Sequence, residues 1–165
     1  MAKEKLVHPQ TGLLVSNFTT DGQPMEGPEG STIWVAAHFL KPLDEEFALD
    51  QYRRARKELG VTMQGFGYSR EWPKSWRGLN DIDSGVVIPG LDVSAGGSGL
   101  ALIGAASFDD LEFLTQLHTT LEFAAFPKRE HGRLKYCASN QVGDAAMLYS
   151  MVLGPIWQRV KEGKQ

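Results

Sequence analysis

Three carboxylates have the residue types and spacing that acid/base chemistry requires. Asp81 and Asp83 are separated by one residue in the run DIDSG, and Glu29 lies two residues before the predicted start of a helix at residue 31. Neighbouring like charges push carboxyl pKa values apart, so one group can donate a proton while another accepts one. We therefore expect Asp83 to act as general acid or base, Asp81 to tune it and Glu29 to oppose them.

The same carboxylates also have structural interpretations. Aspartates close to a glycine commonly accept hydrogen bonds from turn amides, and a carboxylate ahead of a helix interacts with its positive end. Asp81 and Asp83 point the same way only if the backbone between them is extended. Both interpretations stay open for all three residues.

Aromatic side chains are expected to line the same cavity. Trp72 and Trp76 precede the acidic run, Tyr68 lies just before them, and Trp34 belongs to the first long helix. Such rings can stack on a sugar or an apolar ligand, or they can fill a core. For Trp72 and Trp76 the core interpretation is slightly favoured.

A second polar group precedes the last helix. Asn140, Gln141 and Asp144 are expected to contact a polar substrate, although capping of the helix is the simpler role for them. His38 falls on the apolar side of its helix, which is typical of a core histidine. No pair of histidines has the spacing of metal ligands and no glycine-rich segment has a phosphate-loop lysine, so we expect neither a metal nor a cofactor.

Capping residues and apolar periodicity predict five helices that would position these groups. Their ranges are residues 31–41, 44–59, 94–107, 109–125 and 142–161. The second and fourth are amphipathic, while the other three are apolar and should be buried on most sides. Residues 1–30 are rich in glycine and proline and predict an extended arm, so the helical domain covers residues 31–162.

Little regular structure is expected between the second and third helices. Val61 to Tyr68 predict a short extended segment, and Gly132 predicts the turn of a small hairpin. The predicted fold class is therefore all-α: a partial α/α toroid of helical hairpins with one or two short β-hairpins. In a toroid the segments that lead into inner helices share one end, so their polar residues would converge on one cleft.

Three stretches resemble a known family: GPEGSTIW, DVSAGGSGLALIGAASFDDLEFLTQLHTTLEF and VGDAAMLYSMVLGPIW. Across roughly residues 28–160 the pattern resembles the C-terminal portion of the linalool dehydratase/isomerase-like proteins. The resemblance implies an (α/α)6 barrel, of which this chain supplies about half. The cysteine-bearing part of that family's active site belongs to earlier hairpins, so no catalytic residue is carried over. The resemblance also implies either a missing N-terminal half or two associated copies.

Composition narrows the class of partner. The chain has 165 residues, a formal charge of −3 and no basic run, which argues against a nucleic-acid surface. It lacks the roughly 20 consecutive apolar residues of a membrane span and begins without a signal-peptide pattern. We therefore expect a cytoplasmic protein without membrane or nucleic-acid partners.

Two functions follow from the sequence. The first is an enzyme, or the C-terminal half of one, that uses carboxylate acid/base chemistry as a hydrolase or lyase on a small-molecule or saccharide-like substrate. The second is a non-catalytic helical module that binds a partner or its own copy, which would make it a homo-oligomer.

Overall fold

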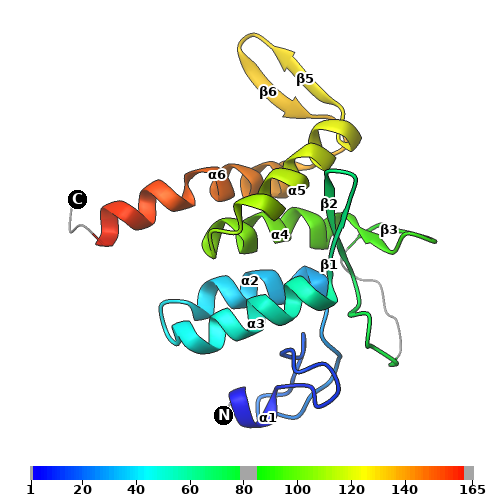
Figure 1. The fold of residues 1–165 in the computed structure, drawn as a ribbon, viewed down its shortest axis with the longest axis vertical. Coiled ribbons are helices and arrows are strands. Elements are labelled where there is room, and N and C mark those ends of the chain that lie inside the picture. Colours follow the sequence, from blue (N-terminus) through cyan, green and yellow to red (C-terminus); the bar gives the residue numbers. More distant parts are fainter. Residues whose placement is uncertain (1, 79–84, 162–165) are drawn as a thin grey trace.

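A computed structural model describes residues 2–78 and 85–161 of the chain. Along the chain, groups of helices are followed by groups of strands: α1 to α3, then β1 to β4, then α4 and α5, then β5 and β6, and finally α6 (Figure 1). The helices are α1 (Ala2–Lys5), α2 (Gly30–Leu40), α3 (Glu45–Glu58), α4 (Ala95–Ser107), α5 (Leu111–Ala124) and α6 (Gln141–Lys161). The strands are β1 (Gly60–Met63), β2 (Phe66–Arg70), β3 (Val87–Ile88), β4 (Val93–Ser94), β5 (Pro127–Glu130) and β6 (Arg133–Tyr136).

Three of the long helices, α3, α4 and α5, begin directly after a capping side chain. Asp44, Ser94 and Asp110 each accept a hydrogen bond from the backbone amide three residues ahead, at 3.1, 2.8 and 3.1 Å. These bonds satisfy amides that have no partner inside the helix. Helix α2, predicted to start at residue 31, begins one residue earlier, at Gly30, and its N-cap residue Glu29 makes no cap hydrogen bond through its side chain.

The all-α prediction is wrong, because the structure is mixed α/β. Strands β1, β2, β4 and β3 form one antiparallel sheet in that order, and β5 pairs with β6 in a second sheet. The partial toroid is thus replaced by helices that pack beside an antiparallel sheet, which lies at one end of α2 and α4 (Figure 1). Two of the strands have only two residues each, too few to show a periodic pattern in the sequence.

Tight turns close both hairpins. Gln64 and Gly65 have φ of 51° and 85° between β1 and β2, and His131 and Gly132 have φ of 49° and 75° between β5 and β6. Two consecutive residues with positive φ define the turn type whose twist matches paired strands. The hairpin predicted around Gly132 is confirmed, whereas the β1–β2 hairpin was predicted only as an extended segment.

The core lies between α2, α3, α4 and α5. Helix α4 packs on α2 at one side and on α6 at the other, and α5 covers α4 and β2. Trp34 of α2 is fully buried, with its ring 5.8 Å from Tyr52 and 5.9 Å from Phe113 between centroids. Gly104 of α4 leaves room for this ring, since a Cβ there would lie 3.1 Å from Trp34 Cε3.

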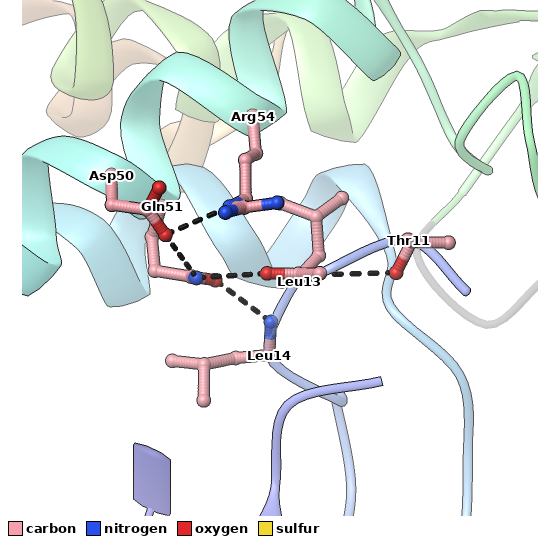
Figure 2. Close-up of polar contacts among 7 residues, drawn as sticks. Thr11, Leu13, Leu14, Asp50, Gln51 and Arg54 are labelled. Atoms are coloured by element: carbon pink, nitrogen blue, oxygen red, sulfur yellow. Dashed lines mark hydrogen bonds and ion pairs between the residues drawn. The ribbon is translucent and has the colours of Figure 1, made fainter. Parts of the chain in front are cut away.

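The N-terminal arm is part of the packed body. Figure 2 shows Gln51 of α3 holding the arm: its Oε1 accepts from the Leu14 amide at 2.8 Å and its Nε2 donates to Gly12 O at 3.0 Å. Leu13 between these contacts is fully buried in the core cluster. The arm therefore packs against α3 through hydrogen bonds between its backbone and the Gln51 side chain, and through burial of Leu13.

Among the described residues, none of the helices combines the length and the apolar character that crossing a bilayer demands.

Candidate functional site

The segments that lead into α2 and α4 meet at one buried carboxylate. Glu71, 1% exposed, accepts from the Ser31 hydroxyl at 2.9 Å through Oε1 and from the Ser94 hydroxyl through Oε2. Its backbone oxygen accepts from the Gly30 amide at 2.6 Å. The segments that lead into α2 and α4 therefore converge, as predicted for the entries to inner helices. Glu71 connects them, although the sequence analysis gave this residue no role.

The predicted catalytic carboxylates are only partly placed. Glu29 is buried, at 7% exposed, and sits at the N-cap position of α2 without a cap hydrogen bond from its side chain. Asp81 and Asp83 lie outside the described residues. The acid/base site built from these three groups therefore stays a prediction.

The predicted aromatic residues do not share one location. Trp34 lies in the core and donates through Nε1 to Ser69 Oγ at 2.9 Å. Trp76 packs edge-on to the His8 ring at 5.1 Å, next to Gly27 of the arm. Trp72 and Tyr68 are half-buried. Trp34 thus fills the core, and Trp76 packs against the N-terminal arm. Packing was one of the two roles that the sequence analysis gave for these rings.

Of the polar residues predicted at the start of α6, Asn140 caps the helix. Asn140 is exposed, and its Oδ1 accepts from the Gly143 amide at 2.9 Å. Gln141 is exposed as well, whereas Asp144 is half-buried and lines a groove beside the β5–β6 hairpin. Among the described residues, no side chain of α2 or α4 lines that groove.

A buried histidine links the other ends of α2 and α4 to α6. His38 is 3% exposed; its Nδ1 lies 2.7 Å from Ser107 Oγ and its Nε2 lies 3.0 Å from the Tyr149 hydroxyl. Ser107 donates to Ile103 O at 2.7 Å, so Nδ1 carries the proton and Nε2 accepts from Tyr149. Burial lowers the pKa of His38, and the positive charge of Lys41 lowers it further. The imidazole is therefore neutral, and its two hydrogen bonds connect α2 to α4 and α6.

The outward side of α6 is an exposed apolar surface to which the sequence analysis gave no role. Between residues 141 and 153 the exposed positions after Gln141 are all apolar or aromatic. We call them the α6 outer face: Val142, Ala145, Leu148, Tyr149, Met151 and Val152. Leu148 and Met151 are 62% and 61% exposed. Soluble helices normally place polar residues on this side, so such a face marks a contact surface.

Comparison with known proteins finds no matching family model and no matching curated protein. The resemblance to the linalool dehydratase/isomerase-like proteins therefore stays a prediction, and the functional argument depends on the structure itself.

Proposed function

We propose that this protein is a self-association module and that α6 of one copy packs on α6 of a second copy. The observation that carries the proposal is the α6 outer face, which has six apolar or aromatic side chains and no charged one. Full burial of a large apolar side chain stabilises by about 1.5–3 kcal/mol, so water exposure of this face is unfavourable.

The packing inside the chain supports a helical partner for this face. Helix α2 is covered by α3, and α4 is covered by α5, whereas the α6 outer face has no covering helix among the described residues. Helix α6 has 21 residues and is about 30 Å long. An antiparallel helix packed along Ala145, Leu148 and Val152 would cover the middle of this face.

A second copy fits this face better than a charged partner. The chain carries a formal charge of −3, so two copies repel each other weakly, and contact through the uncharged α6 outer face adds no pair of like charges. Two such faces would bury on the order of 1,000 Å² in total, which reaches the lower limit for a specific interface. A two-fold axis near Leu148 would place Ala145 opposite Met151 of the second copy.

The test is the mass of the protein in solution. We expect a dimer by light scattering at about 0.1 mM, and a monomer after Leu148→Glu combined with Met151→Glu, because two charges per copy would be buried without partners. Met63→Glu on β1, a position 54% exposed, is the matched control and should leave the dimer intact. A monomeric wild type would refute the proposal.

A cross-link tests the geometry separately. In a Cys137→Ser background, which removes the single exposed cysteine, Leu148→Cys lies near the proposed axis and should form a disulfide with its own copy under mild oxidation. Met63→Cys should not. A dimer that forms without this cross-link would place the contact elsewhere on the surface.

A further inference from the structure

The β5–β6 hairpin and the first turn of α6 enclose an open groove of about 600 Å³, within the size range of small-molecule sites. Unpaired charges of both signs line it. Arg133 and Lys135 from β6 are exposed, and neither makes an ion pair with another described residue. Asp144 faces them from α6, and its carboxylate has no ion pair within the described part of the chain.

The register of the hairpin concentrates positive charge on one face. Lys128 pairs directly with Lys135, and Glu130 pairs with Arg133, so all four side chains share a face. Like charges directly opposite each other destabilise a strand pair. Glu130 offsets Lys128 through an ion pair of 2.6 Å, which leaves Lys135 and Arg133 without a negative partner.

The Asp144 carboxylate, in turn, lacks a positive partner and a hydrogen-bond donor across residues 2–78 and 85–161. Its Oδ1 is buried and accepts no hydrogen bond from any described residue, although buried carboxylates normally bind several donors. Tyr136, which lies near Asp144, donates its hydroxyl proton to Glu122 and so gives Asp144 no hydrogen bond. The cations of β6 line the same groove but do not pair with Asp144, so a ligand with both charges would satisfy both sides.

We propose that this groove binds a small amino-carboxylate zwitterion, whose carboxylate contacts Arg133 and Lys135 and whose ammonium group contacts Asp144. This site is independent of self-association, because it uses the hairpin and the flank of α6 and not the α6 outer face.

The test compares a zwitterion with its two halves. Calorimetry and amide chemical shifts would be measured with 4-aminobutyrate and 6-aminohexanoate, and with acetate and methylamine as the separate charged groups. We expect one of the zwitterions to bind at least about tenfold more tightly than either half, with shifts confined to residues 127–144. Equal binding of zwitterion and acetate, or no binding of any probe at about 10 mM, would overturn the proposal.

Three variants assign the contacts. Lys135→Gln should weaken zwitterion and acetate binding together, whereas Asp144→Asn should reduce zwitterion binding to about the level of acetate. Lys57→Gln on the exposed side of α3 is the matched control and should change neither. If Asp144→Asn fails to fold, Lys135→Gln and the comparison of probes still decide the outcome. Unchanged binding in a folded Asp144→Asn variant would contradict the role of this carboxylate.

Discussion

His38 shows how one side chain can connect three helices. It belongs to α2, its Nδ1 contacts Ser107 at the end of α4, and its Nε2 contacts Tyr149 of α6. A protonated imidazole at this buried position would lose its hydration and the hydrogen bond that Nε2 accepts. The sequence correctly predicted a buried core histidine, but not its partners, which lie 69 and 111 residues away along the chain.

The lowered pKa of His38 predicts a loss of stability in acid. The unfolded chain binds the proton near the ordinary value of 6.5, whereas the folded chain binds it only at a lower pH. Stability is therefore constant above about pH 6.5 as far as His38 is concerned, and falls as the pH drops below that value. Between about pH 7.5 and 5.5 the melting temperature of His38→Gln should fall less than that of wild type.

The comparison of wild type and variant isolates His38, because other groups titrate in both proteins. Thermal unfolding by circular dichroism at matched ionic strength is the measurement. Parallel pH profiles in the two proteins would show that His38 keeps its ordinary pKa in the folded state.

At the scale of elements, the glycines of α4 are not equivalent. A Cβ at Gly99 would meet no atom within 4 Å, whereas a Cβ at Gly104 would lie 3.1 Å from Trp34 Cε3 and 3.4 Å from its Cβ. Glycine in a helix interior costs up to about 1 kcal/mol relative to alanine. Gly104 is thus required for the close approach of α4 to α2, and Gly99 is not.

This difference predicts opposite outcomes for two single substitutions in one helix. Gly99→Ala should raise the free energy of unfolding by up to about 1 kcal/mol. Gly104→Ala should give no such gain, because the added methyl group must displace a fully buried tryptophan ring. Urea unfolding of both variants measures the two values, and an equal gain at the two sites would contradict the packing described for α2 and α4.

For the whole molecule, the N-terminal arm belongs to the core. Leu13 is fully buried against the long helices, and the arm on either side of it is fixed by Gln51 (Figure 2). The prediction of a separate extended arm followed from its glycines and prolines. Those residues do produce turns, but the apolar run Leu13 to Val15 supplies buried side chains.

Leu13→Ala should therefore destabilise the whole protein by about 2–5 kcal/mol, the range for a truncated core leucine. Leu43→Ala, at a position 81% exposed, is the matched control and should change stability by less than about 0.5 kcal/mol. Urea denaturation followed by tryptophan fluorescence distinguishes the two. A small effect at Leu13 would mean that the arm unfolds independently of the helices.

Local interactions explain what the sequence alone determined. The long helices fall within two residues of their predicted ranges at each end, because caps such as Asp44 and Ser94 act over three residues and the apolar repeat acts over four. The β5–β6 hairpin was predictable for the same reason, since its turn is set by His131 and Gly132.

Only the tertiary structure decided the rest. Strands β3 and β4 exist because β2 offers hydrogen bonds to β4, not because two residues have a strand pattern of their own. Glu71 acquires its role from Ser31 and Ser94, 40 and 23 residues away. The apolar side chains of α6 were visible in the sequence, but which of them face α4 and which face solvent depends on how the helix packs. Long-range packing therefore decides which side of α6 is exposed, whereas the groove beside the β5–β6 hairpin is formed by residues close together in the sequence.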